Sequence, residues 1–221
     1  MIRASFQESI DSVKEKLFEM AEMVIQSINR SIEALRTKNT EEAERIKADD
    51  ELINKKRWEI EEECINLIAT QQPVATDLRK LIAILNIIVD LERMGDHAEG
   101  IAKIVIMHRE QPLVKPLIDI PRMAEKATEM IKKSIEAFER EDMELAQRIC
   151  EMDDEVDILH EQIYRELISF MLEDPKTITR ATYLIWAAHN LERIADRVTN
   201  ICERIVFLVS GTMKKINVSK Y

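Results

Sequence analysis

The stretch "DLERMGDHAEGIAKIV", Asp90 to Val105, decides the fold and contains the first candidate site. Its Glu92 and Asp96 lie four residues apart, about one helical turn, where two like charges repel by about 0.2–0.5 kcal/mol. Nearly the same sequence returns as "NLERIADRVTNICERIV", Asn190 to Val206, with the Glu and the Asp in the same register. A repeated unfavourable pair indicates that another group compensates for it in both copies.

The repeat extends over most of the chain. "IEALRTKNTEEAERIKADD" (residues 32–50) matches "IEAFEREDMELAQRICEMD" (residues 135–153) at an offset of 103 residues. Beyond the loop around Pro73 the offset is 100, because that loop has three extra residues. The chain is therefore a tandem duplication of units of about 100 residues, an ordinary domain size. We expect one domain over residues 1–110 and another over residues 111–221.

Six helical segments are expected. Gly (3) and Pro (5) are scarce among the 221 residues, and helix formers dominate. The predicted breaks are residues 37–40, with Thr40 as an N-cap, then 70–77, 140–143 and 173–177, with Pro175 opening the last helix. The proline-rich segment 110–121 separates the first three helices from the last three. The predicted fold is all-α, a pair of three-helix bundles with long helices.

The composition excludes several classes of protein. There are 42 Asp and Glu residues against 32 Lys and Arg, a net charge of −10, which argues against nucleic-acid binding and against docking on an anionic membrane. The three cysteines are isolated, so neither a zinc–thiolate site nor a disulfide framework is expected. The N-terminus lacks the apolar region of a signal peptide, and the most apolar run, residues 81–89, is too short to span a bilayer. We expect a cytoplasmic protein.

The third and sixth segments each carry a heptad-spaced apolar seam, which predicts their buried faces. At about 100° per residue, Glu92 and Asp96 lie roughly 100–140° from the seam residue Leu91, at the border of the core. Glu99 shares their stripe, and Glu192 and Asp196 repeat the placement. The seams are Ile84, Ile87, Leu91, Met94, Ala98, Ile101 and Val105, and Leu184, Ala187, Leu191, Ile194, Val198, Ile201 and Ile205.

The second and fifth segments carry an aspartate at an apolar position of their seams. Asp50 interrupts the first seam, and Asp153 interrupts the second at the equivalent place. One turn further on stand Asn54 and Asp157. A carboxylate on an apolar seam is costly unless it is paired or liganded, so two equivalent ones indicate a shared purpose.

Two clusters of oxygen ligands follow if these helices face each other. The first would gather Asp50, Asn54, Glu92 and Asp96, and the second Asp153, Asp157, Glu192 and Asp196. All-oxygen clusters suit Mg²⁺, Mn²⁺, Ca²⁺ or ferric iron. The alternative is a metal-free helical adaptor in which Arg93 and Arg193 bridge the carboxylates.

The histidines and tryptophans are less informative. His97 and His189 adjoin the two motifs but do not recur between the halves, so we expect neither to be a ligand. His160 lies one turn after Asp157, and the sequence allows it to be either a ligand or a core histidine. Trp58 and Trp186 are expected to be packing residues.

Enzymatic chemistry is not expected. A carboxylate-bridged di-metal enzyme of the ferritin type needs two Glu-x-x-His motifs in a four-helix bundle. This chain offers only "DILH", residues 157–160, and that motif is not repeated. No glycine-rich phosphate loop and no nucleophile–base arrangement is present.

The sequence resembles the PhoU family of phosphate-specific transport regulators. "LERMGDHAEGI" and "LERIADRVTNICE" look like the paired Glu-x-x-x-Asp signatures of that family, and "QQPVATDLRKL" and "MLEDPKTI" look like its bundle-opening loops. The duplicated "DDELIN" and "DDEVD" stand at the matching places. The resemblance runs from about Phe6 to Phe207. It implies two three-helix bundles related by a pseudo-twofold axis.

The resemblance also implies a function. The chain would be a negative regulator of phosphate uptake and of phosphate-starvation signalling, and its partners would be a phosphate ABC transporter and a sensor histidine kinase. It would reach the membrane only through these partners, and a homodimer is expected. Some family members carry multinuclear iron or zinc clusters on these carboxylates. Asn54, in place of an aspartate, leaves the first site one charge poorer, and Gly95 stands where the second signature has Ala195.

Overall fold

The computed structural model describes residues 2–108 and 111–213, and within them every regular element is a helix. This confirms the all-α prediction. The predicted domain boundary, between residues 110 and 111, falls beside residues 109–110, which lie outside the described part. The elements are α1 (Ile2–Thr37), α2 (Thr40–Gln71), α3 (Ala75–His108), α4 (Asp119–Arg140), α5 (Met143–Glu173), the 3₁₀ turn η1 (Pro175–Thr177) and α6 (Ile178–Ser210).

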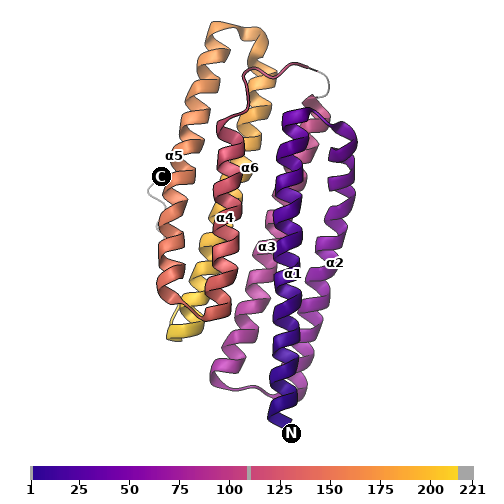
Figure 1. Cartoon of the computed structure of the whole chain (residues 1–221), viewed down its shortest axis with the longest axis vertical. Helices are drawn as coiled ribbons and strands as arrows, with labels where there is room; N and C mark the ends of the chain where they lie inside the picture. The colour runs from indigo at the N-terminus through magenta and orange to yellow at the C-terminus, as the bar shows by residue number, and fades with distance from the viewer. Residues whose placement is uncertain (1, 109–110, 214–221) are drawn as a thin grey trace.

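The helices form two three-helix bundles side by side (Figure 1). α1, α2 and α3 contact one another in the first half, and α4, α5 and α6 do so in the second. α3 packs along α6, and α1 contacts α4, so the two halves join through their central helices. No helix of the described part combines the length and the apolarity needed to cross a membrane.

Two helix starts differ from the sequence-based expectation. The cap of α2 is Asn39 rather than Thr40, and its side chain accepts a hydrogen bond from the backbone N–H of Glu42 at 3.0 Å. Asn and Thr are both good N-cap residues. Because α2 begins at Thr40, the cap is the residue before it, Asn39. Pro175 does not open α6 directly. It begins η1, and Asp174 caps that turn through the N–H of Lys176 at 3.1 Å.

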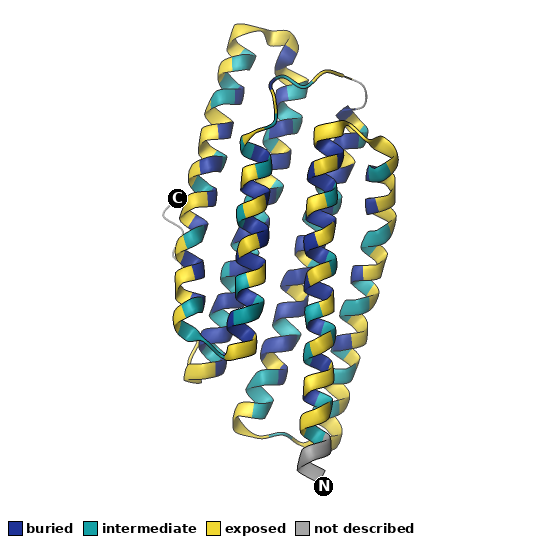
Figure 2. Cartoon of the chain, in the orientation of Figure 1, coloured by how far each residue is buried: buried dark blue, intermediate teal, exposed yellow. Residues whose placement is uncertain are grey.

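The core follows the two predicted seams of α3 and α6, and every seam residue on these helices is buried. Figure 2 shows buried positions facing inward on all six helices, with exposed positions on their outer sides. Of the two seam aspartates, Asp153 is buried at 3% exposure, whereas Asp50 is only half-buried. Trp58 and Trp186 are 54% and 48% exposed, so the expectation that they are packing residues is wrong.

Polar contacts between α3 and α6 fix the register of the two halves. The carboxylate of Asp90 accepts hydrogen bonds from Asn200 Nδ2 at 3.1 Å and Arg197 Nη1 at 3.3 Å. At the pseudo-equivalent place, His97 Nδ1 lies 2.9 Å from Asn190 Oδ1. The predicted sequence offset of 100 residues relates Asp90 to Asn190 and His97 to Arg197. The Asp90–Arg197 contact and the Asn190–His97 contact are therefore equivalent in the two halves, but one is an ion pair and the other joins an amide and an imidazole.

A lysine holds the segment between the halves against the second bundle. Lys115 is buried, at 9% exposure, and its ammonium pairs with Asp119 Oδ2 at 3.3 Å and with Glu166 of α5. Arg180 Nη1 also donates to the carbonyl of Pro112 at 3.0 Å. These contacts fix how the chain enters α4.

We predict that Asp90→Ala lowers the free energy of unfolding by about 1–2 kcal/mol, because Arg197 and Asn200 lose their acceptor in a partly buried interface. Urea unfolding measured by circular dichroism is the test. Glu44→Ala, which removes an exposed acid that pairs with Lys47, should change stability by less than about 0.5 kcal/mol. Equal effects of the two substitutions would contradict the role given to Asp90.

Candidate functional site

The first carboxylate cluster forms where α2 crosses α3 beside Gly95. A Cβ at Gly95 would lie 3.1 Å from Ile53 Cδ1 and 3.2 Å from Asp50 Oδ1. These distances are tighter than ordinary van der Waals contact, so the missing side chain makes room for the Asp50 carboxylate against α3. The sequence comparison with Ala195 treated this glycine as a minor difference, whereas the structure gives it a place in the site.

Like charges surround Asp50. Its pKa rises to about 6, mainly because burial penalises the charged form and further because Asp96, Glu99 and Glu92 repel it. Asn54 acts in the opposite direction, since its Nδ2 donates to Asp50 Oδ2 at 3.1 Å. Asp50 is therefore within electrostatic reach of Glu92, Asp96 and Glu99 and hydrogen-bonded to Asn54, the residues that the sequence predicted for the first site.

The second cluster, between α5 and α6, is buried more deeply. The pKa of Asp153 rises to about 7, through burial first and then through the charges of Asp157, Asp196, Glu192 and Asp154. Burial and Asp196 raise the pKa of Glu192 to about 7 as well. The pKa of Asp157 is also raised, by burial and by Asp196 and Asp154. These shifts are stability costs, because a charged carboxylate is favoured less in the folded chain than in water.

Basic side chains pair with the more exposed carboxylates. Arg93 Nη1 lies 3.2 Å from Asp96 Oδ2, and Arg193 Nη1 lies 2.5 Å from Asp196 Oδ2. Lys103 pairs with Glu99 at 2.5 Å. Arg93 and Arg193 are 54% and 41% exposed, so each pair adds little stability. The arginines proposed in the metal-free alternative are thus present, and Arg93 also lies 3.4 Å from the less exposed Glu92.

Carboxylate oxygens are ligands that hard and borderline cations prefer. Glu192 Oε2 is buried and accepts no hydrogen bond, although His189 Nδ1 lies 3.3 Å from it. A buried carboxylate oxygen without a hydrogen bond, close to other carboxylates with raised pKa values, would be stabilised by a bound cation. In the described residues, however, no three His, Cys, Asp or Glu side chains converge as a metal site would require. To bind an ion, the carboxylates would have to rotate toward a common point. The metal role therefore stays a prediction.

A cavity of about 560 Å³ opens beside the second cluster. Its lining includes Asp157, His160, Tyr164, Glu192, Arg193 and Asp196. The rings of His160 and His189 are 6.1 Å apart between centroids. Burial, and to a smaller extent the charge of His189, lowers the pKa of His160, which favours the neutral imidazole that can bind a metal. His160 is therefore at the site, whereas His97 lies in the α3–α6 interface.

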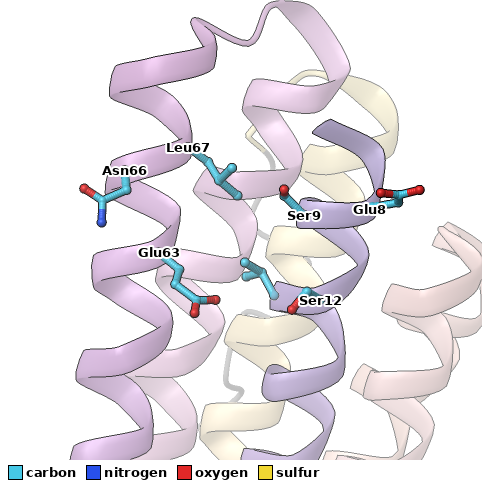
Figure 3. Close-up of a pocket in the computed structure, with 7 residues that line it drawn as sticks. Glu8, Ser9, Ser12, Glu63, Asn66 and Leu67 are labelled. Atoms are coloured by element: carbon cyan, nitrogen blue, oxygen red, sulfur yellow. The ribbon is translucent and has the colours of Figure 1, made fainter. Parts of the chain in front are cut away.

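A groove of about 420 Å³ lies elsewhere, between α1 and α2 (Figure 3). Glu8, Ser9 and Ser12 line it from α1, and Glu63, Asn66 and Leu67 line it from α2. Glu63 already pairs with Lys16 of α1. None of the residues predicted for the two sites lies in this groove.

The fold and the two sites define a class of protein: an all-α tandem repeat with a carboxylate cluster in each half. A family model described as the PhoU domain matches residues 17–105 and again residues 120–205. The chain therefore belongs to the PhoU domain family, as the sequence resemblance predicted. Each match covers most of one half and includes that half's Glu-x-x-x-Asp motif.

Individual relatives are similar over nearly the whole chain. The "Phosphate-specific transport system accessory protein PhoU homolog" of Aquifex aeolicus is 40% identical over 208 residues, which are 94% of each chain. The Escherichia coli protein, "Phosphate-specific transport system accessory protein PhoU", is 32% identical over 95% of this chain and 87% of its own.

Crystal structures of two relatives have the same fold. "PhoU from Pseudomonas aeruginosa" has a TM-score of 0.88 and 33% identity, over 94% of this chain and 100% of the other. The "phosphate transport system regulatory protein PhoU from Streptococcus pneumoniae" has a TM-score of 0.88 and 31% identity, over 95% and 99%. The likeness extends over both halves, so the tandem arrangement is shared.

The raised pKa values predict how the stability of chelator-treated protein depends on pH. Folded Asp153 holds its proton up to about pH 7, whereas in the unfolded chain it loses it near pH 4. The folded state therefore binds more protons between these values, and the free energy of unfolding should fall as the pH rises from 4 to 7.

Asp153→Asn should remove much of this loss and stabilise the chelator-treated protein by about 2 kcal/mol at pH 8, with little effect at pH 4. Chemical denaturation across this pH range is the measurement. Glu151→Gln, at an exposed position of the same helix, should reproduce the wild-type profile. Wild-type stability that rises between pH 5 and pH 8 would contradict the electrostatic description of the cluster.

Proposed function

We propose that this chain is a cytoplasmic regulatory protein of a phosphate-specific transport system and has no catalytic activity of its own. It binds the cytosolic parts of a phosphate ABC transporter and a sensor histidine kinase, and it restrains phosphate uptake and the starvation response. The observation that carries this proposal is the likeness to accessory proteins of phosphate-specific transport over 94% of both chains. It acts as a homodimer and contacts the membrane only through its partners.

A regulator without catalytic activity can act only if it binds one state of its partner more tightly than another. A regulator that binds the active and resting transporter equally shifts neither. The long helices offer extended outer faces for such contacts, including the exposed aromatic side chains Trp58, Tyr164 and Trp186. Exposed aromatic residues of this kind are typical anchors of protein interfaces.

Deletion of the gene in its own host tests the regulatory role. The expected result is high phosphatase expression and raised phosphate uptake in phosphate-rich medium, both reversed when the wild-type gene is restored. If phosphatase stayed repressed and uptake stayed normal after deletion, the regulatory proposal would fail. Co-purification of the tagged chain with the transporter and with the kinase separates the two partners.

We also propose that the two carboxylate clusters bind metal ions, with iron or zinc clusters as first candidates and Mg²⁺ or Mn²⁺ as others. The support is electrostatic, since Asp50 and Asp153 each lie among like charges at a partly or fully buried place. A bound cation would supply positive charge to these carboxylates. The metal-free adaptor is the second candidate, favoured by the observed Arg93–Asp96 and Arg193–Asp196 pairs. A di-metal enzyme would instead show dioxygen-dependent oxidation of the metal.

Elemental analysis of protein purified without chelator distinguishes these candidates. We expect bound metal in the wild type and less in Glu92→Gln/Asp96→Asn and in Glu192→Gln/Asp196→Asn. The matched control is Glu151→Gln/Glu155→Gln, an exposed pair of α5 with the same four-residue spacing, which should keep the metal. Absence of metal from the wild type, with stability unchanged in both site variants, would leave the metal-free adaptor.

A further inference from the structure

The cavity between α5 and α6 carries an excess of negative charge. Its lining holds four carboxylates against one basic side chain, Arg193, which is already paired with Asp196. Positive charge within the lining is therefore lacking beside Asp157 and Glu192. The four carboxylates are those of Asp157, Glu161, Glu192 and Asp196.

The shape of this cavity suits a side chain better than a single ion. A metal ion needs several ligand atoms that converge on one point at about 2–2.6 Å, and within the described residues no three His, Cys, Asp or Glu side chains do so. A volume of about 560 Å³ is instead that of a pocket for an organic group. Two of the lining residues, Ile158 and Tyr164, are exposed and offer apolar or aromatic surface. A cationic group on an apolar stem would contact both kinds of lining.

The first half shows which group the repeat holds at the equivalent place. At the offset of 103 residues, Arg57 and Glu61 of α2 stand where α5 has His160 and Tyr164. Arg57 Nη2 lies 3.2 Å from Glu61 Oε2, and the Arg57 side chain is only 25% exposed. The framework of the repeat therefore accommodates a largely buried guanidinium in the first half. In the second half the shorter His160 replaces that arginine, and α5 supplies no guanidinium from this position.

The chemistry of the lining favours an arginine over a lysine. A guanidinium is planar, donates five hydrogen bonds in a fixed fork and is less strongly hydrated than an ammonium group. It pairs with carboxylates through two parallel hydrogen bonds, and it stacks on the face of a tyrosine ring. Glu192 Oε2, which is buried and accepts no hydrogen bond, is an acceptor for such a donor.

We propose that the cavity between α5 and α6 binds an arginine side chain presented by a partner protein. Asp157 and Glu192 accept its hydrogen bonds, and Tyr164 provides the ring on which the guanidinium stacks. In the first half Arg57 already fills the equivalent place. This inference rests on the partner-binding part of the proposed function, and not on its metal-binding part. It adds the face of the molecule that docks and the side chain that this face recognises.

Titration of the full, chelator-treated chain with the peptide acetyl-Gly-Arg-Gly-amide, followed by NMR of the isotope-labelled protein, tests the site. At about pH 8 the carboxylates are ionised, and saturable shifts are expected at the backbone amides of α5 and α6 around His160. The same peptide with citrulline in place of arginine keeps the shape but loses the charge, so it should bind at least about tenfold more weakly. The lysine peptide should also bind more weakly than the arginine peptide.

Variants of the lining identify the groups that hold the guanidinium. Asp157→Asn/Glu192→Gln should weaken binding of the arginine peptide by about tenfold or more, and Tyr164→Leu should weaken it by about two- to fivefold. The matched control is Glu151→Gln/Glu155→Gln, which makes the same change of charge at exposed positions of α5 and should bind as the wild type does.

His160→Arg tests the comparison between the halves, also where the carboxylate variant disturbs folding. This substitution gives α5 the guanidinium that α2 has at Arg57, so the chain should fill its own cavity and lose the arginine peptide. In cells, the same variant should lose co-purification with the partner that docks here, while the Glu151→Gln/Glu155→Gln control keeps it.

The inference is overturned if the arginine and citrulline peptides bind equally, or if the shifted amides lie away from α5 and α6. Wild-type affinity in Asp157→Asn/Glu192→Gln would overturn it as well. If the wild type and His160→Arg co-purify equally with the transporter and the kinase, this cavity is not the docking site, and the regulatory proposal stands. If the peptide binds in the cavity but the wild type captures neither partner, the partner-binding part of the proposed function fails, and the arginine site stands.

Discussion

The packing of α3 and α6 in the middle of the molecule is the constraint on which its other features depend. α3 is covered by α1, α2 and α6, and α6 is covered by α3, α4 and α5. Each central helix therefore keeps only a narrow stripe that is not occupied by the core. The Glu-x-x-x-Asp motifs lie on these stripes, where the neighbouring α2 and α5 bring a further carboxylate against them. The packing that positions these carboxylates also partly buries them.

This arrangement carries a cost that the chain retains in both halves. Burial and mutual repulsion raise the pKa values of Asp50, Asp153 and Glu192 into the range of about 6 to 7. The exposed Arg93 and Arg193 offset this repulsion only weakly. A structural role alone would be served as well by apolar residues at these positions. This electrostatic cost is the observation on which the proposed metal role rests.

Duplication gave the chain two frameworks of the same shape, and later substitutions made them chemically different. The α3–α6 interface has Asp90 with Arg197 on one side and Asn190 with His97 on the other. The halves also differ one turn further along α2 and α5, where the offset of 103 residues relates Arg57 to His160. Both halves match the same domain model, but the charges at these equivalent positions differ.

The sequence by itself determined the helices, the duplication, the seams of α3 and α6 and the grouping of the carboxylates. These follow from local periodicity and from comparing one half with the other, both of which are readable along the chain. Only the tertiary structure decided that Asp153 is buried while Asp50 is half-exposed, that Trp58 and Trp186 face outward, and that Asp90 and Lys115 hold the halves and their connection. Such facts depend on which helix covers which face, and helical periodicity gives the direction of a side chain but not the neighbour that it meets.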